Sequence, residues 1–388
     1  MHICIVGSSK KFFSGISAYT IVMANAFAER RHKVSVILLR NLVPLFFYPG
    51  RDRVGKGKYI VDFLPGINVY NGMDWNSPIS WYGAYRFLKE NKPDATILHW
   101  WTSSVAHMQL LLALAKNMNG EKNKVILEMH EVVDTLEEKI IPLRLYSRVA
   151  GKGLLKLCDA YTAHSNDARQ SIIKAYNIPQ DKIHVVPHGP YNAYGTDDSK
   201  DDGNELKLNG FTILHFGMIR QYKGISLLIK AFNMLPEEIA GNSNLIIVGE
   251  DWGDDAELLP ALNESPYRNR IIFQPEFLPD ELVPRYFNAA DVVVLPYLRT
   301  CGSGVVNIAV AQGKYIITSE LNTMKESLGE YKGVAYFPVG DTNTLRNRLI
   351  EAYDKWRFGE IEHYHYSDTS WQFIVQQYEK IVAAIKNQ

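Results

Sequence analysis

The sequence predicts an α/β protein made of two doubly wound domains, each a parallel sheet wrapped by helices. Strand-like and helix-like segments alternate along both halves of the chain, a pattern typical of parallel sheets. A chain of 388 residues is also too long for one ordinary core. Between the halves, residues 194–210 are acidic, contain glycine and lack periodicity, as expected of a surface linker.

Each half has its own series of expected strands. In the first half the helix-like segments 16–32 and 105–118 lie between strand-like ones, at 2–8, 33–40, 95–101, 124–131, 160–165 and 183–189. The alternation restarts after the linker, with strand-like segments at 211–217, 244–250, 270–276, 290–297, 314–319 and 333–339. The final segment, 370–388, places apolar side chains on one helical stripe, which requires a partner surface. The stripe consists of Trp371, Ile374, Val375, Tyr378, Ile381, Val382 and Ile385.

The composition of the chain excludes several classes of function. The chain is 46% hydrophobic and 22% charged, as in soluble globular proteins. Lys and Arg together number 42, as do Asp and Glu, so no overall positive field favours nucleic acid. The three cysteines are far apart and form no CxxC pair, which argues for a reducing compartment and against a disulfide framework or a zinc site. With no signal-peptide pattern and no apolar run of about 18 residues, the expected location is the cytoplasm.

A basic loop in the second half is the first candidate site. The stretch FGMIRQYKG, residues 216–224, predicts a strand, a short loop and a helix, with Arg220 and Lys223 in the loop. In open α/β sheets, ligands bind outside the carboxyl ends of the strands. Arg offers a bidentate fork and Lys a mobile point charge, a combination suited to phosphate oxygens. The alternative is a solvated surface loop whose charges hold no ligand.

A second candidate follows the expected strand 290–297. The stretch TCGSGVVNIAVAQG, residues 300–313, predicts a helix that begins near Ser303. Small residues there, Gly302 and Gly304, let a ligand approach the backbone N–H groups, and the helix dipole favours negative charge. The alternative is that Ser303 is a plain N-cap. Two phosphate-compatible turns in one domain are stronger evidence than either alone.

The first half lacks the GxGxxG fingerprint of dinucleotide binding. Its first loop reads GSSKKFFSGIS, with Gly15 where the loop enters a helix, so a hydride-transferring enzyme is poorly supported. Gly15 either accepts a ligand or permits a turn. His130 and Glu131 close the strand-like segment 124–131, again at a carboxyl edge, although a single histidine is more often structural.

Three further histidines have open roles. His188 either faces an interdomain cleft or forms a turn with Pro187 and Gly189. His363 and His365 could suggest a metal, but no third ligand is spaced with them, so no metal is expected.

Taken in order, these segments resemble the family 4 glycosyltransferases, which are retaining enzymes of the GT-B fold. The resemblance covers nearly the whole chain and lies in the order and spacing of the segments. It is carried by SGIS, HE, AHSNDARQSI, IPQDKIHVVPHGPYN, HFGMIRQYKGISLLIKAF, NLIIVGE, FLPDELVPRYFNAADVVVLPY and GSGVVNIAVAQGKYIITS.

The resemblance implies two facing Rossmann-like domains. It places the nucleotide-sugar in the C-terminal domain and the acceptor towards the N-terminal one, and it implies a final helix that crosses back to the N-terminal domain. The expected domains are therefore 1–193 with 371–388, and 211–370, joined by the linker 194–210.

The resemblance also assigns roles to residues. Arg220 and Lys223 match the basic pair that grips the donor diphosphate, and His130 matches the histidine that faces the donor sugar. These three are the expected catalytic residues. The other expected donor contacts are Gly15, Gly217, Glu250, Phe277, Leu278, Ser303, Gly304 and Val305.

Two departures from the family pattern stand out. Met218 occupies a position where many members carry Arg, and the loop arginine comes two residues later. The family's two glutamates, separated by seven residues, are replaced by Cys301 and Ala309. The second glutamate usually contacts the ribose, and Glu250 or Asp251 is the nearest candidate to replace it.

The implied reaction is transfer of a sugar, with retention of configuration, from a UDP- or GDP-sugar to the hydroxyl of a glycan, lipid-linked or small-molecule acceptor. Negative charge develops on the β-phosphate, and the basic pair and the helix start can stabilise it without a divalent metal or a cofactor. The missing glutamates leave two alternatives. One is a catalytically silent protein that binds a nucleotide-sugar or a partner, and the other is a GT-B nucleotide-sugar epimerase.

One basic and aromatic segment, residues 40–58, has two interpretations. It holds five cations and one Asp around the sequence LVPLFFYPG. It could rest on an anionic membrane surface, or form an acceptor-side loop whose aromatic side chains turn inward. Pro44 and Pro49 interrupt any helix there.

Overall fold

The computed structural model describes residues 1–9, 15–42, 61–101, 103–117, 123–130, 150–189, 206, 208–300, 302–364 and 370–387. Most of the predicted linker 194–210 and of the segment 40–58 lies outside these residues, as do Glu131, Cys301 and His365.

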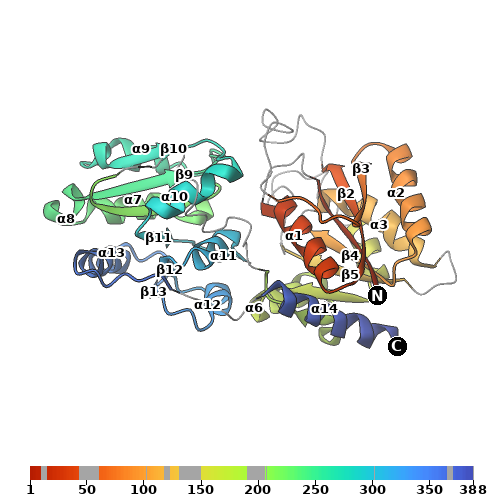
Figure 1. The fold of residues 1–388 in the computed structure, drawn as a ribbon. Coiled ribbons are helices and arrows are strands. Elements are labelled where there is room, and N and C mark those ends of the chain that lie inside the picture. Colours follow the sequence, from red (N-terminus) through yellow and green to blue (C-terminus); the bar gives the residue numbers. More distant parts are fainter. Residues whose placement is uncertain are drawn as a thin grey trace. The chain divides into compact units, whose positions relative to one another are not determined.

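The chain folds as two compact units, Met1–Gly189 with Thr369–Gln388, and Pro190–Asp368 (Figure 1). Each unit contains one sheet, and every strand pairing within both sheets is parallel. The predicted α/β class with two parallel sheets is therefore confirmed.

The N-terminal sheet has seven strands in the order β3-β2-β1-β4-β5-β6-β7. These are β1 (His2–Ser8), β2 (Lys33–Asn41), β3 (Asn68–Asp74), β4 (Ala95–Trp100), β5 (Lys124–Met129), β6 (Ala160–Ala163) and β7 (Ile183–Val185). Every residue of β1 and β4 is buried, so helices cover both faces of the sheet, as parallel sheets require. The strand order reverses between β1 and β4.

Several helices of this unit begin with a serine that caps the first turn. The helices are α1 (Gly15–Glu29), α2 (Pro78–Asn91), α3 (Ala106–Leu114), α6 (Asn166–Tyr176) and α14 (Trp371–Lys386), with short 3₁₀ turns η3 (Ser103–Val105), η4 (Ala115–Asn117) and η5 (Gln180–Lys182). Ser165, for example, caps α6 by accepting from the Ala168 N–H at 3.0 Å. Residues 150–157 are also helical.

The last helix, α14, packs on the N-terminal unit (Figure 1). All seven side chains of the predicted apolar stripe are buried, and the helix contacts α1 and β5. Tyr378 reaches Thr162 of β6, with 3.1 Å between the two hydroxyl oxygens. Glu379 binds Arg30 and His32 beside α1. The stripe thus has the partner surface that its sequence requires.

The C-terminal sheet has six strands in the order β10-β9-β8-β11-β12-β13. These are β8 (Phe211–Phe216), β9 (Ser243–Val248), β10 (Ile271–Gln274), β11 (Val292–Leu295), β12 (Tyr315–Ser319) and β13 (Val334–Phe337). The strand order reverses between β8 and β11, so the ends of these two neighbours form the switch point of the unit.

The helices and the strands of the C-terminal unit both contribute to its core. The helices are α7 (Ile225–Asn233), α8 (Glu237–Gly241), α9 (Leu258–Asn263), α10 (Val283–Ala289), α11 (Gly304–Ala311), α12 (Asn322–Leu328) and α13 (Thr342–Arg357), with 3₁₀ turns η7 (Gln221–Lys223), η8 (Arg268–Arg270) and η9 (Asp280–Leu282). The α7 stripe of Ile225, Leu228, Ile229 and Phe232 is fully buried against the sheet and α13. No helix within the described ranges is long and apolar enough to cross a membrane.

Candidate functional site

One candidate site is the switch point of the C-terminal sheet, at the carboxyl ends of β8 and β11. Switch points are where open α/β sheets bind ligands. The loop after β8 carries Arg220 and Lys223, and α11 begins just beyond the loop that follows β11. The two phosphate-compatible turns identified in the sequence therefore lie on adjacent strands.

These two loops are in direct contact. The backbone N–H of Leu298 donates to the carbonyl oxygen of Tyr222 at 2.8 Å. Lys223 places its ammonium nitrogen 3.7 Å from the centre of the Tyr297 ring, and the Tyr297 hydroxyl lies 3.2 Å from Ser303 Oγ. One chain of contacts thus runs from the basic loop to the start of α11.

A glycine permits this close approach. Gly224 has a φ of +67°, and a Cβ added there would lie 2.1 Å from the carbonyl oxygen of Pro296. Any other residue would push the two loops apart.

The guanidinium of Arg220 is held in one orientation. Its Nε donates to Asp254 Oδ2 at 2.5 Å, and its Cζ lies over the Trp252 ring, 4.5 Å from the ring centre. Asp254 is itself fixed, because its Oδ1 accepts from the Gln221 N–H at 2.9 Å. Asp254 accepts from the Nε–H of this guanidinium. A phosphate would instead be bound by the N–H donors on the two terminal nitrogens.

The start of α11 is a helix N-terminus with small residues around it. Ser303 caps the helix, its Oγ accepting from the Val306 N–H at 3.4 Å. The N–H groups of Gly304 and Val305 lack intrahelical acceptors, as in the first turn of any helix. Gly217, at the end of β8, has a φ of +114°, and a Cβ there would lie 3.1 Å from Val305 Cγ2. The end of β8 and the start of α11 are therefore packed together.

The remaining predicted donor contacts of this unit follow β9 and β10. Glu250 comes directly after β9 and accepts from the Trp252 indole N–H at 3.2 Å, so the same indole contacts both Glu250 and Arg220. Phe277 and Leu278 are half-buried in the segment after β10. Ala309, at the position of the second family glutamate, is completely buried within α11.

A separate candidate, within the N-terminal unit, is a polar cluster at the carboxyl edge of its sheet. Its centre is Glu128 of β5, which is completely buried. The Tyr19 hydroxyl donates to Glu128 Oε1 at 2.6 Å. His99 Nε2 lies 3.0 Å from Glu128 Oε2, and His130 Nε2 lies 3.7 Å from the same oxygen. His130, a predicted site residue, is thus part of a larger group.

Two more histidines extend this cluster along the sheet edge. His164 directly follows β6, and its Nε2 lies 3.1 Å from His130 Nδ1. His188, after β7, has its ring centre 4.9 Å from that of His164. The other nitrogen of each ring faces the backbone: His164 Nδ1 lies 3.1 Å from the Val186 carbonyl oxygen, and His188 Nδ1 lies 2.8 Å from the Gly189 carbonyl oxygen.

Burial lowers the pKa of three of these imidazoles. It lowers the pKa of His130 to about 3, although the neighbouring Glu128 acts in the opposite direction. Burial also lowers the pKa of His164, and it lowers that of His188 well below the usual range. For Glu128, burial opposes ionisation, but the imidazoles of His130 and His99 outweigh it and hold its pKa well below its usual value.

Two further sequence candidates are Gly15 and His363. Gly15 begins α1. His363 lies against Gly313, where an added Cβ would come within 2.0 Å of its Nδ1.

The sequence reasoning missed His99, His164, Glu128, Tyr19 and Asp254. A signal for the first two was present, because His99, His130, His164 and His188 lie at or just beyond the carboxyl ends of neighbouring parallel strands. Such ends meet at one edge of a sheet.

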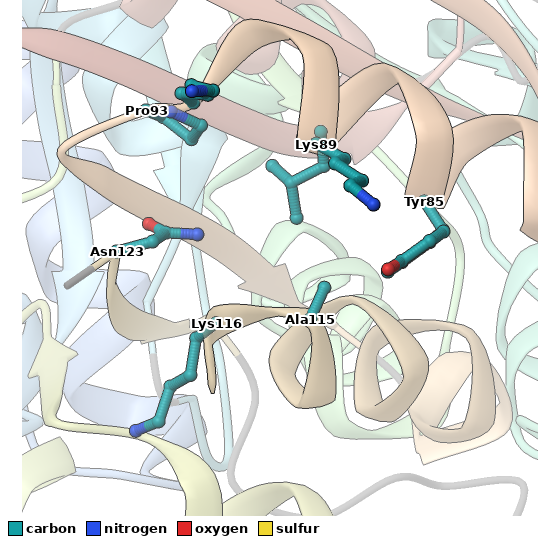
Figure 2. Close-up of a pocket in the computed structure, with 8 residues that line it drawn as sticks. Tyr85, Lys89, Pro93, Ala115, Lys116 and Asn123 are labelled. Atoms are coloured by element: carbon teal, nitrogen blue, oxygen red, sulfur yellow. The ribbon is translucent and has the colours of Figure 1, made fainter. Parts of the chain in front are cut away.

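A small hollow in the N-terminal unit is a different feature. Figure 2 shows it between α2 and the turn after α3, lined by Tyr85, Lys89, Pro93, Ala115, Lys116 and Asn123. Pro93 and Asn123 precede β4 and β5, so the hollow lies at the amino edge of the sheet, away from the ligand-binding edge. Lys116 turns to Asp159 and to the Leu157 carbonyl oxygen.

Two Rossmann-like parallel-sheet units, with a phosphate-compatible switch point in the second, define the GT-B class of glycosyltransferases. The family model described as Glycosyltransferase Family 4 matches residues 13–190, and the model described as Glycosyl transferases group 1 matches residues 210–355. The chain belongs to this family of group 1 glycosyltransferases, as the sequence resemblance predicted.

Individual relatives are distant but cover most of the chain. The D-inositol 3-phosphate glycosyltransferase of Xylanimonas cellulosilytica is 22% identical, over 79% of this chain and 78% of its own. The lipopolysaccharide 1,2-N-acetylglucosaminetransferase of Salmonella typhimurium is 23% identical, over 88% and 97%.

Solved structures share the fold. Anabaena HepE in complex with UDP-glucose has a TM-score of 0.65 and 18% identity, covering 100% of this chain and 98% of its own. The catalytic domain of starch synthase IV from Arabidopsis thaliana, bound to ADP and acarbose, has a TM-score of 0.69 and 12% identity, covering 100% and 99%.

Proposed function

We propose that this glycosyltransferase moves a hexosyl group, with retention of configuration, from a UDP- or GDP-sugar to a hydroxyl of a glycan or lipid-linked acceptor. The proposal rests on the series of contacts from Lys223 through Tyr297 to Ser303. These contacts hold a cation beside a helix N-terminus at the switch point, an arrangement suited to a diphosphate.

The proposed chemistry uses charge stabilisation. When the bond between the sugar and the diphosphate breaks, negative charge grows on the β-phosphate. Arg220, Lys223 and the first N–H groups of α11 would stabilise that charge, in a site where the Arg220 fork is already oriented by Asp254. The acceptor hydroxyl would attack from the face that the diphosphate leaves, and the leaving phosphate would take its proton. No divalent cation is required in this scheme.

Other donor contacts are proposed from the family pattern. Phe277 and Leu278 would hold the base, Gly217 and Glu250 would lie beside the nucleotide, and Gly15 and His130 would act from the N-terminal unit on the sugar side. The neighbours HepE, with UDP-glucose, and starch synthase IV, with ADP, support a nucleoside diphosphate donor.

A screen of UDP-, GDP- and ADP-sugars by thermal shift, followed by product analysis of the best binder, tests the proposal. A ligand that binds the native state raises the melting temperature. Release of nucleoside diphosphate with sugar on an added acceptor would support it. Binding without release would favour a catalytically silent protein, and an altered sugar-nucleotide formed without acceptor would favour an epimerase.

A cytoplasmic location with peripheral membrane contact through residues 40–58 is also proposed, from their five cations and aromatic cluster. Each cation near an anionic surface contributes about 1 kcal/mol, and salt screens it. Co-sedimentation with anionic vesicles should therefore fall as salt is added. Equal pelleting with neutral vesicles would contradict the proposal.

A further inference from the structure

Three imidazoles converge at the carboxyl edge of the N-terminal sheet. His130, His164 and His188 follow the neighbouring strands β5, β6 and β7. One ring nitrogen of each lies within 4.8 Å of those of the other two. We propose that these histidines form a binding site for one divalent transition-metal ion.

The tautomers of two rings are fixed by the backbone. A carbonyl oxygen only accepts hydrogen bonds, so His164 Nδ1 and His188 Nδ1, facing the Val186 and Gly189 carbonyl oxygens, carry the protons. In the neutral rings both Nε2 atoms therefore present lone pairs. This is the usual arrangement of metal-binding histidines, whose second nitrogen donates to a carbonyl or a carboxylate.

His130 completes the argument, because neither neutral tautomer suits it. With its proton on Nδ1 it bonds His164 Nε2, but its Nε2 lone pair then faces the Glu128 carboxylate at 3.7 Å. With its proton on Nε2 it faces Glu128 favourably, but two lone pairs then oppose each other at 3.1 Å between His130 Nδ1 and His164 Nε2. Among the described residues, His130 Nε2 has no hydrogen-bond partner.

A cation between these nitrogens removes the conflict. A second proton on His130 would do so only by charging a buried ring, which burial opposes. A metal ion bound by His130 Nδ1, His164 Nε2 and His188 Nε2 satisfies all three lone pairs and leaves the His130 Nε2–H directed at Glu128. That is a carboxylate–histidine–metal arrangement.

The chemistry of the ligands selects the ion. Imidazole nitrogens favour Zn²⁺, Co²⁺, Ni²⁺ and Cu²⁺, whereas Mg²⁺ and Ca²⁺ favour oxygen. Neutral imidazoles bind without releasing protons. Three histidines leave one tetrahedral position for water or another ligand. With Nδ1 on the metal and Nε2–H towards Glu128, His130 has no ring nitrogen left for a sugar hydroxyl, so this role replaces the direct sugar contact proposed for His130 above.

Cobalt binding to the full-length protein, stripped of metal by chelator and dialysed, tests this site. We expect about one Co²⁺ per chain, with the intense visible absorption of tetrahedral cobalt, displaced by Zn²⁺. Zn²⁺ should also raise the melting temperature of the wild type. Loss of an outer partner costs about 10–100-fold in metal affinity, so Glu128→Gln should weaken binding by that factor, and His164→Ala or His188→Ala by at least about 100-fold.

A matched control separates ligation from general damage. His184→Ala removes a histidine of β7, four residues before His188 and outside the cluster, and it should bind Co²⁺ like the wild type. Circular dichroism of each metal-free variant checks that it is folded. A wild type that binds no Co²⁺ or Zn²⁺ would overturn the proposal. So would folded His164→Ala and His188→Ala variants that keep the wild-type cobalt spectrum and affinity. Neither readout involves glycosyl transfer, so the result decides the role of His130 without deciding the diphosphate site of the C-terminal unit.

Discussion

The ammonium nitrogen of Lys223 lies 3.7 Å from the centre of the Tyr297 ring. Lys223 belongs to the loop after β8 and Tyr297 to the loop after β11, so this cation–π contact joins the two sides of the switch point. Such contacts contribute about 0.5–2 kcal/mol. Because the Lys223 side chain is thereby positioned before any ligand arrives, less of its rotamer entropy remains to be lost on binding.

The basic pair gives the first prediction. Arg220→Ala and Lys223→Ala should each weaken donor binding or turnover by roughly 10- to 150-fold, since a charge-assisted hydrogen bond is worth about 1.5–3 kcal/mol. Steady-state kinetics with the donor found in the screen measures this. Lys230→Ala is the control, because Lys230 lies on α7 and pairs with Glu257 at the surface. Unchanged kinetics in both Arg220→Ala and Lys223→Ala would remove the diphosphate assignment.

The second prediction concerns Asp254, which orients Arg220. Asp254→Asn keeps the size of the side chain but replaces a charged hydrogen bond by a neutral one, a difference of about 1 kcal/mol or roughly 5-fold in kcat/KM. The effect should vanish in the Arg220→Ala background, because the two residues then no longer act together. Simple addition of the two losses in the double variant would show that Asp254 does not act through Arg220.

The positions of Arg220, Lys223 and Ser303 were predictable because each depends on local sequence. An apolar strand, a short loop and a helical stripe place the first two, and small residues before an apolar helix identify the cap. The partner Asp254 was not predictable, since it reaches Arg220 only after the chain has passed through α7 and β9. Such a contact depends on how α7 and β9 return the chain to the end of β8, and not on the residues next to Arg220 in the sequence.

Two elements of the N-terminal unit differ in how well the sequence predicts them. The stripe of α14 was visible in the sequence, and its seven apolar positions are buried. Strand β3, Asn68–Asp74, was not predicted, because it is an edge strand with exposed and polar positions that hide the apolar run of a parallel strand. The histidine cluster was not predicted, because each member alone resembles an ordinary packed histidine. Only the order of the strands in the sheet brings these histidines together.

The third prediction is that the diphosphate needs no Mg²⁺ or Mn²⁺. It rests on the cations and helix start at the switch point, which supply positive charge themselves. In buffer freed of divalent ions, with Zn²⁺ resupplied equally to all samples, addition of Mg²⁺ or Mn²⁺ should leave the initial transfer rate unchanged. Strong activation by either ion would refute this prediction.

The fourth prediction uses the attachment of α14 through Glu379. Hydrogen bonding to Arg30, aided by His32 and opposed by burial, lowers the pKa of Glu379 below 4.5. The stability it contributes is therefore present above that value and is lost as the pH falls through the lower pKa of the folded state. Glu379→Gln should cost about 0.5–1 kcal/mol at pH 7, given the partial exposure of the pair.

Calorimetry of the wild type and Glu379→Gln across this range measures the effect, and their difference should shrink as the pH falls below about 4.5. Glu90→Gln is the control, since Glu90 makes an exposed pair with Arg86 along α2. A difference between the wild type and Glu379→Gln that stays constant from pH 7 down to the acid transition would show that the carboxylate charge is not responsible.

The last prediction concerns the ribose of the donor. Ala309 stands where a ribose-binding glutamate is usual, and it is completely buried in α11. The nearest carboxylates by topology are already engaged, because Glu250 accepts from the Trp252 indole and Asp251 from the Gly253 N–H. A site without a dedicated acceptor discriminates weakly against a missing hydroxyl. A 2′-deoxyribose donor should therefore be used nearly as well as the ribose donor, and Glu250→Gln should leave their ratio unchanged. A fall in kcat/KM beyond about 10-fold, or roughly 1.4 kcal/mol, for the deoxy donor would instead reveal ribose recognition. If Glu250→Gln then abolished the difference, Glu250 would be the replacement acceptor.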